Sequence, residues 1–159
     1  MAMVIYRKAD RSDILSMARI RALHSGTEED WQPRLGRYMA CEHHPQQALM
    51  PRVVYVSVES GSVVGLVAGH LTRRYGCDGE LQWIDVIPKC RGTGIAFKLL
   101  SRLAQWFAEQ EASRICVNVD PANTHARRFY MRHGAEGLNE HWLVWNDIKI
   151  VLRQKFADG

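Results

Sequence analysis

The sequence predicts a mixed α/β fold in which a mostly antiparallel sheet is flanked by helices. Its 159 residues, of which 47% are hydrophobic, suit one domain with its own core. Two β-branched runs separated by the polar segment 59–62 are typical of an antiparallel hairpin. After residue 80, a strand, a glycine turn, a helix and another strand follow in the order of a right-handed parallel crossover.

The first third of the chain predicts one strand and two helices. Residues 3–8 are β-prone, and Asp10 or Ser12 can cap a helix that Gly26 ends. Thr27, followed three residues later by Asp30, resembles a capping box at the start of a second helix. Apolar positions on that helix are Trp31, Leu35, Tyr38 and Met39, and the pattern is interrupted at His43, His44, Pro45 and Pro51.

The middle of the chain predicts a hairpin followed by the crossover. The hairpin strands span 53–58 and 63–71, and a third strand spans 80–87 and ends at Pro88. After the glycines at 92 and 94, a long helix carries one apolar stripe. The stripe consists of Ile95, Ala96, Leu99, Leu100, Leu103, Trp106 and Phe107.

The last third predicts a strand, a helix and a second hairpin. The strand spans 115–119, and Asp120 with Pro121 suits the start of a helix that Gly134 ends. Two further β-rich runs, 142–145 and 148–156, are joined by Asn146-Asp147, which suits a tight turn.

Composition narrows the possible partners and the compartment. The net charge of +4 and the pI of about 9.0 favour anionic ligands. No apolar run reaches the ~18 residues of a membrane helix, and Arg7, Lys8 and Asp10 stand where the apolar part of a signal peptide would lie. We therefore expect a cytoplasmic protein without a membrane partner. We expect no metal, since no metal-ligand spacing occurs, and the cysteines Cys41, Cys77, Cys90 and Cys116 suit reduced packing residues.

The glycine turn Arg91-Gly92-Thr93-Gly94-Ile95-Ala96 is the main candidate for a binding site. Glycines at the start of a helix let several backbone N–H groups approach one anion, although they also permit a simple tight turn. A Walker A loop is absent, and a dinucleotide fingerprint would need a third glycine and an earlier position in the chain.

Two segments in the expected order are similar to the signatures of the GNAT superfamily of acyl-CoA-dependent N-acyltransferases. The first reads Val86-Ile-Pro-Lys-Cys-Arg-Gly-Thr-Gly-Ile-Ala-Phe-Lys-Leu-Leu100, and the second runs from Asn123 through Ala126, Phe129 and Tyr130 to Gly134. Ala135 departs from the Phe or Tyr usual after the closing glycine. The resemblance implies a single N-acetyltransferase domain over 1–159, with its sheet split between the strands at 80–87 and 115–119.

The resemblance also implies how acetyl-CoA binds as co-substrate. The backbone near Val86 would pair with the pantetheine arm, and the loop would hold the diphosphate through Arg91, Gly92, Thr93, Gly94, Ile95 and Ala96. Asn123 would touch pantetheine or adjacent backbone, although helix capping alone also fits it. Tyr130 would lie near the thioester sulfur. Because a phenol (pKa ~10) is a weaker acid than a thiol (pKa ~8.5), we expect Tyr130 to stabilise the leaving thiolate by hydrogen bonding.

The acceptor amine needs a proton acceptor, because deprotonating a lysine-like amine at pH 7 costs about 4.6 kcal/mol. Glu80 is the candidate, since it is predicted at the splayed start of the third strand on the same face as Gln82 and Val86. Asp85 would point to the other face unless a bulge intervenes. His24, His70 and a water relay remain alternatives.

These features predict direct transfer of an acetyl group to a primary amine in a ternary complex. The acceptor stays open among small amines, antibiotics and peptide or protein amines; Glu28, Glu29 and Asp30 suit either a cationic amine or their own helix dipole. The alternatives are a non-catalytic acyl-CoA sensor and a nucleic-acid-binding stripe of Arg127, Arg128 and Arg132. Trp142 and Trp145 could pair across a homodimer.

Overall fold

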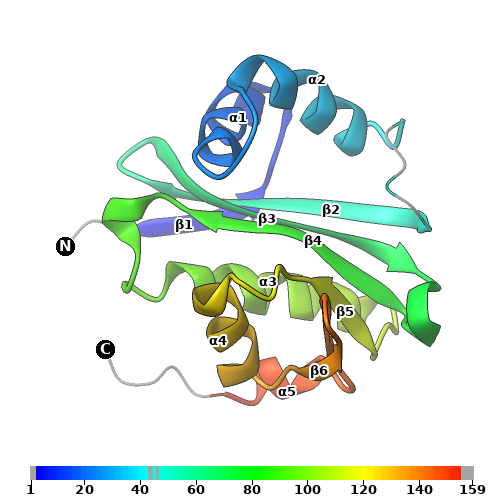
Figure 1. Cartoon of the computed structure of the whole chain (residues 1–159). Helices are drawn as coiled ribbons and strands as arrows, with labels where there is room; N and C mark the ends of the chain where they lie inside the picture. The colour runs from blue at the N-terminus through cyan, green and yellow to red at the C-terminus, as the bar shows by residue number, and fades with distance from the viewer. Residues whose placement is uncertain (1–2, 43–44, 46, 155–159) are drawn as a thin grey trace.

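The computed structural model describes residues 3–42, 45 and 47–154. Seven strands form one sheet in the order β1-β2-β3-β4-β5-β7-β6 (Figure 1). The strands are β1 (Val4–Lys8), β2 (Ala48–Glu59), β3 (Ser62–Thr72), β4 (Gly79–Val86), β5 (Ile115–Asn118), β6 (Glu136–Asn139) and β7 (Trp142–Trp145). All neighbouring strands are antiparallel except β4 and β5. The predicted mixed, mostly antiparallel sheet and its parallel crossover are therefore confirmed.

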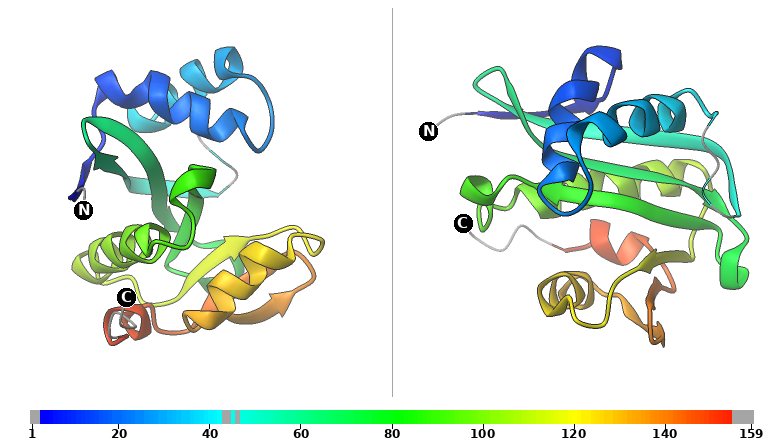
Figure 2. Two further views of the ribbon diagram at one scale, coloured as in Figure 1. Left: turned by 90° about the vertical axis from the view of Figure 1, so that its left-hand side faces the viewer. Right: turned by 45° about the horizontal axis from the view of Figure 1, so that its top comes forward.

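Helices cover both faces of this sheet (Figure 2). In both views of Figure 2, α1 and α2 lie together on one face and α3 lies on the other. The α-helices are α1 (Ile14–Ala22), α2 (Glu28–Met39), α3 (Ile95–Glu109), α4 (Thr124–Arg132) and α5 (Lys149–Leu152), and short 3-10 turns span Arg11–Asp13, Arg74–Gly76 and Pro88–Cys90.

Each face of the sheet has its own apolar core. The core under α1 and α2 consists of Met17, Ala18, Ile20, Trp31, Leu35, Tyr38, Val54, Val56, Leu66, Ala68 and Trp83. The core on the α3 face is larger and includes Leu99, Leu103, Phe107, Ile115 and Trp145, all at most 1% exposed. The predicted stripe of α3 packs here, with Ala96 at its edge.

The predicted helix starts in the first third are correct. Asp10 caps the turn before α1 and forms a reciprocal capping box with Asp13. Thr27 caps α2, and its hydroxyl accepts a hydrogen bond from the Asp30 backbone N–H at 3.1 Å. These local polar contacts satisfy amides that the helices leave without partners.

The first hairpin is also confirmed, but β2 is longer than its predicted span. It begins at Ala48, so Pro51 lies inside the strand and does not precede it. The register shifts between Leu49 and Arg52, which is the kind of irregularity where a residue without an N–H is tolerated. The predicted interruption at His43 and His44 lies outside the described residues.

The predicted start of α4 at Asp120 and Pro121 is wrong. The helix begins at Thr124, because the Asn123 side chain accepts from the Ala126 N–H and acts as the cap. The Asp120 carboxylate instead accepts from the Ala122 N–H in a local turn before the helix.

The predicted final hairpin is wrong as well. The last hairpin joins β6 to β7, and the residues after Asp147 form α5, whose start is closed by a hydrogen bond from the Lys149 N–H to the Asp147 carboxylate. Ile148 and Val151 are each 1% exposed, so burial follows a helical spacing and not a strand alternation. Phe156, the predicted end of that hairpin, lies outside the described residues.

Candidate active site

The sheet opens between β4 and β5. Strand β4 pairs with β3 as far as Val86, which lies opposite Gly65, but it pairs with β5 only from Gly79 to Leu81. From Gln82 onward, no described residue of β5 pairs with the other edge of β4. Because buried backbone N–H and C=O groups are nearly always hydrogen-bonded, this open edge suits an extended ligand. The split of the sheet predicted at these two strands is therefore present.

The glycine loop lies at the end of that open edge. Gly92 and Gly94 have φ values of 76° and 86°, a region that favours glycine. Gly94 is the N-cap of α3 and offers no side chain to its first-turn amides, and that turn contains no acidic residue. The free N–H groups of the first turn therefore form an uncapped, positive end of α3, which suits a diphosphate.

The side chains of the loop divide by burial. Arg91, Gly92 and Thr93 are exposed, whereas Ile95 is 3% exposed and anchors the helix start in the α3 core. The Thr93 hydroxyl donates to the Cys90 carbonyl and so closes the turn from inside. Ile95 can therefore serve a bound anion only through its backbone N–H.

The two signature residues of α4 lie on the α3 side of the sheet. Asn123 caps its helix, as described, and Tyr130 is 6% exposed in the core that also holds Val86 and Ile95. The Tyr130 ring packs edge-to-face on Trp145, with centroids 5.7 Å apart. Among the described residues we find no hydrogen-bond partner for its hydroxyl, which leaves that O–H available to a ligand.

The electrostatic surroundings make Tyr130 a weak acid. Burial raises the pKa of its phenol, the Asp85 carboxylate raises it further, and Arg21 acts in the opposite direction. Tyr130 therefore lies within electrostatic range of both charged residues. A raised pKa suits a hydrogen-bond donor that keeps its proton and disfavours complete proton transfer to a thiolate.

A bulge in β4 decides which carboxylates share a face. Ala68 lies opposite Trp83 and the adjacent Gly69 opposite Leu81, so Gln82 is an extra residue. Leu81 packs in the α3 core, whereas Trp83 packs under α1 and α2. The bulge thus reverses which side chains of β4 point to each face of the sheet.

The consequence is that Glu80 and Asp85 both face α1 and α2. Glu80 pairs with His70, whose other ring nitrogen binds α2, and Asp85 binds α1. The predicted common face of Glu80 and Val86 is wrong for this reason. The predicted splayed position of Glu80 is also wrong, because its partner Cys116 lies within the paired stretch of β5.

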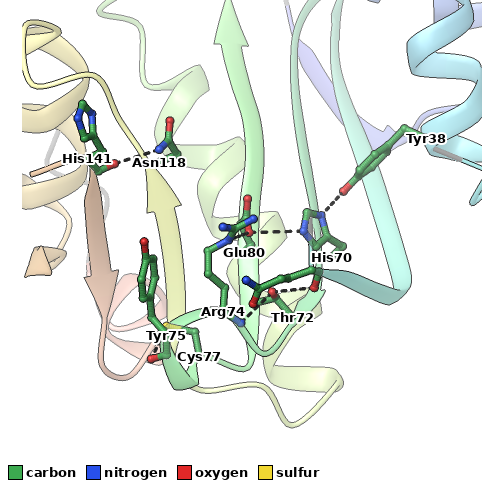
Figure 3. A network of polar contacts seen from close by, with 10 residues as sticks. Tyr38, His70, Thr72, Arg74, Tyr75, Cys77, Glu80, Asn118 and His141 are labelled. Carbon is green, nitrogen blue, oxygen red and sulfur yellow. Dashed lines mark hydrogen bonds and ion pairs between the residues drawn. The ribbon is translucent and has the colours of Figure 1, made fainter. Parts of the chain in front are cut away.

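Glu80 ends a chain of buried polar contacts (Figure 3). The Tyr38 hydroxyl lies 2.8 Å from His70 Nδ1, and His70 Nε2 lies 3.7 Å from Glu80 Oε1. Arg74 Nε donates to the same carboxylate oxygen at 3.1 Å. His70 is fully buried and Glu80 is 5% exposed. Burial raises the pKa of the Tyr38 phenol, so this residue holds its proton and keeps His70 oriented.

Asp85 forms a second polar group beside the open edge. Its side chain is 4% exposed, and the carboxylate accepts a 2.7 Å hydrogen bond from Arg21 Nη1 and lies 2.8 Å from His24 Nε2. The His24 side chain is 43% exposed. A buried carboxylate therefore orients an imidazole that reaches solvent, the arrangement typical of a general base.

The structure thus brings together most, but not all, of the predicted residues. Val86, the loop and Tyr130 gather on the α3 side of the open edge, while Glu80 lies at the closed end of β4.

Trp142 and Trp145 are 9% and 0% exposed within their own chain, so they offer no surface for a dimer. The homodimer stays a prediction.

Sequence analysis missed Arg21, Arg74 and the roles of the tryptophans. Arg21 and Asp85 are 64 residues apart, so no local pattern connects them. The only available signal was the shared helical face of Trp31 and Tyr38, which indicated burial and not a site.

Across the described residues, no helix has both the length and the apolar character needed to span a membrane.

Comparisons with known proteins agree with this geometry. The profile of the acetyltransferase (GNAT) family matches residues 18–135, whereas no relative is found among curated proteins. Among solved structures, the chain is similar to the aminoglycoside N-acetyltransferase AAC(6')-Iy in complex with CoA (18% identity, TM-score 0.73, 87% of this chain and 91% of that one).

Two further solved structures have the same fold. The PaiA N-acetyltransferase of Thermoplasma acidophilum in complex with coenzyme A shares 11% identity, a TM-score of 0.67 and coverage of 89% and 97%. An acetyltransferase of Thermus thermophilus shares 18% identity, a TM-score of 0.70 and coverage of 89% and 96%. With three quarters of the chain inside the family profile and the split sheet in place, the chain belongs to the GNAT acetyltransferase family.

Proposed function

We propose that this protein transfers an acetyl group from acetyl-CoA to a primary amine by direct attack in a ternary complex. The observation that carries the proposal is the open edge of β4 from Gln82 to Val86, which leads to the uncapped start of α3. The pantetheine arm pairs with that edge, and the diphosphate binds the loop amides between Gly92 and Ala96. A backbone N–H near Val86 polarises the thioester carbonyl.

Each signature residue has a part in this proposal. Tyr130 donates a hydrogen bond to the sulfur as the thiolate leaves, which its raised pKa supports, as does the lack of a partner for its hydroxyl among the described residues. Arg91 adds positive charge beside the diphosphate. Asn123 acts mainly as the cap that fixes the start of α4, and through it the position of Tyr130.

Two groups compete for the proton of the acceptor ammonium. Glu80, predicted from the sequence, is partnered by Arg74 and lies in the paired part of β4. His24, held by Asp85, lies beside the open part and reaches solvent. Parallel pH–rate profiles of Glu80→Gln and His24→Asn separate them. The variant that lacks the true base loses the acidic limb of its pH–rate profile and at least about tenfold in kcat. The other variant keeps the wild-type profile.

The acceptor's identity is open at this level. Structural neighbours include the spermidine N-acetyltransferase chimera from Vibrio cholerae and human sequences, AAC(6')-Iy and a NatC complex bound to Gag peptide, so the shared fold is compatible with several amine classes.

The first experiment is a thermal shift with acetyl-CoA followed by a thiol-release screen against a panel of amines. Binding to the folded state alone raises Tm. A raised Tm with release of CoA by at least one amine supports the proposal. A raised Tm without turnover favours the alternative of a non-catalytic acyl-CoA sensor, and no shift at saturating acetyl-CoA would remove the cofactor assignment.

A further inference from the structure

Two arginines and two tryptophans form one cluster on the α1–α2 face of the sheet. The rings of Trp31 and Trp83 meet edge-to-face with centroids 5.5 Å apart. Arg21 Cζ lies 4.5 and 5.6 Å from the two ring centroids, and Arg34 Cζ lies 4.5 and 5.7 Å from them. Both guanidinium groups therefore lie against the same pair of indoles, which we call the Trp–Arg cluster.

The charges around this cluster do not balance. The Asp85 carboxylate already contacts Arg21 and His24, and the Glu80 carboxylate already contacts Arg74. Among the described residues, Arg34 has no carboxylate within ion-pair distance. The two buried carboxylates beside the cluster therefore already have cationic partners, and the exposed carboxylates of Glu29 and Asp30 stand at the start of α2, whereas the Arg34 guanidinium offers an anionic ligand a positive charge.

Two details of the arginines point to a missing anion. Arg21 Nε is buried and has no hydrogen-bond partner in the part of the chain that the structure describes, although Nη1 of the same group binds Asp85. The pKa of Arg34 is lowered, first by burial and second by the positive charge of Arg21, so the two guanidinium groups are near enough to repel each other. An oxyanion between them would satisfy the buried N–H and relieve the repulsion.

The cluster lies beside the open edge of β4. Trp83 follows the bulge, in the stretch that β5 does not pair, and shares its face with Asp85. Gln82, the first residue of that stretch, has a buried Oε1 for which residues 3–42, 45 and 47–154 offer no hydrogen-bond partner. Trp83 thus has two neighbours with a buried polar atom that lacks a partner among the described residues: Gln82 before it in the strand and Arg21 over its ring.

We propose that the acceptor is a primary amine that also carries a carboxylate, which binds the exposed guanidinium of Arg34 where it lies over Trp31, next to Arg21. This inference rests on the proposed acetyl transfer. Guanidinium groups bind carboxylates through paired N–H donors, and stacking on an aromatic ring fixes the plane of those donors. The ammonium end lies toward Gln82 and the Asp85–His24 pair, where a proton can leave. Polyamines without an anionic group are disfavoured.

The test uses ligands that differ only in charge. Amino carboxylates of increasing chain length, their carboxamides, amino phosphonates of matched length and diamines are titrated calorimetrically into the protein saturated with CoA. The variants are Arg34→Gln and the control Arg37→Gln, which removes an exposed arginine from the same helix. Thermal unfolding of both variants shows whether the fold is intact.

The expected result is that the best amino carboxylate binds at least about tenfold tighter than its carboxamide. Arg34→Gln reduces that preference to less than about threefold, whereas Arg37→Gln keeps it. The phosphonates test whether a phosphate oxyanion replaces the carboxylate, and tighter phosphonate binding would overturn the carboxylate assignment. Equal binding of acid and amide, tightest binding of a diamine, or an unchanged preference in Arg34→Gln would also overturn it.

Failure of the proposed function gives a different pattern. Selective binding of an amino carboxylate without CoA release from acetyl-CoA supports the anion site and overturns acetyl transfer. CoA release with diamines alone supports acetyl transfer and overturns the anion site.

Discussion

The proposed cofactor side of the candidate site is formed mainly by backbone groups of one short segment, whereas the proposed acceptor side is formed by side chains from three elements. The first runs from Val86 through the loop to Ala96. The second joins the end of α1, the face of α2 and the open part of β4. Backbone recognition depends on conformation and tolerates most side chains, while side-chain recognition depends on each residue. Under the proposed function, substitutions on the acceptor side would change the acceptor and leave the cofactor side intact.

The largest expected effect is a loss of CoA affinity when Gly94, in the loop on the proposed cofactor side, is replaced. A side chain at φ 86° costs about 1–2 kcal/mol, so the residue that precedes the first-turn amides of α3 should leave this conformation. Gly94→Val should weaken CoA binding about 100-fold by calorimetry.

Gly61→Val is the matched control for that measurement. Gly61 has φ 79° in the β2–β3 turn, with nothing near its Cβ position, so the variant carries similar backbone strain away from the site. Comparable losses of Tm with a normal CoA affinity in Gly61→Val assign the effect to the loop. Normal affinity in Gly94→Val would mean that the glycines serve only the turn.

The second largest expected effect is a loss of stability and turnover when Asp85, on the proposed acceptor side, is replaced. Asp85→Asn leaves Arg21, whose side chain is 15% exposed, without its charged partner. Breaking such a pair costs about 3–5 kcal/mol when it is fully buried, so we expect a loss of about 3 kcal/mol in urea unfolding, together with at least about tenfold in kcat.

Asp13→Asn provides the comparison for Asp85. Asp13 is also buried and binds Arg7 through both carboxylate oxygens at 2.7 and 2.9 Å, but it lies at the start of α1. It should lower stability without changing kcat. An equal loss of kcat in both variants would show that Asp85 acts only through stability.

The third prediction concerns Tyr130, which lies with Val86 and the loop on the α3 side of the open edge. Tyr130→Phe removes a hydroxyl that has no hydrogen-bond partner among the described residues, so Tm should stay nearly constant while kcat falls about 10- to 100-fold. Steady-state kinetics with saturating acetyl-CoA gives the value. Because no internal hydrogen bond is lost, unchanged turnover would remove the role assigned to Tyr130.

The smallest effect should be a pH dependence of stability on the cofactor side. His133 stacks on Phe97 of α3 at 4.7 Å and hydrogen-bonds Gln154, and burial lowers its pKa below the usual 6.5. The unfolded chain therefore binds a proton here more readily than the folded protein, so stability falls as pH drops below about 6.5. His133→Gln should reduce that fall by about 1 °C in Tm between pH 7 and 5, and equal slopes would contradict it.

Local patterns predicted the elements whose boundaries are set by neighbouring residues. The caps at Asp10 and Thr27 and the apolar stripe of α3 each depend on contacts within one helix. The prediction for the final segment was wrong because Asn146-Asp147 suits both a hairpin turn and a helix start. The helix forms because the Ile148 N–H binds the Ser113 carbonyl and the Ile148 side chain is buried in the α3 core.

For the site, the sequence by itself determined the half that lies in one continuous stretch. Glycines before a helix produce an uncapped positive end wherever the helix is placed, so the anion loop is readable from Gly92 and Gly94. Only the tertiary structure decided the acceptor half. One extra residue at Gln82 reversed the faces of β4, moved Asp85 beside Arg21 and His24, and placed Trp83 against α2. The physical reason is that a bulge changes side-chain alternation, and alternation decides which distant side chains meet.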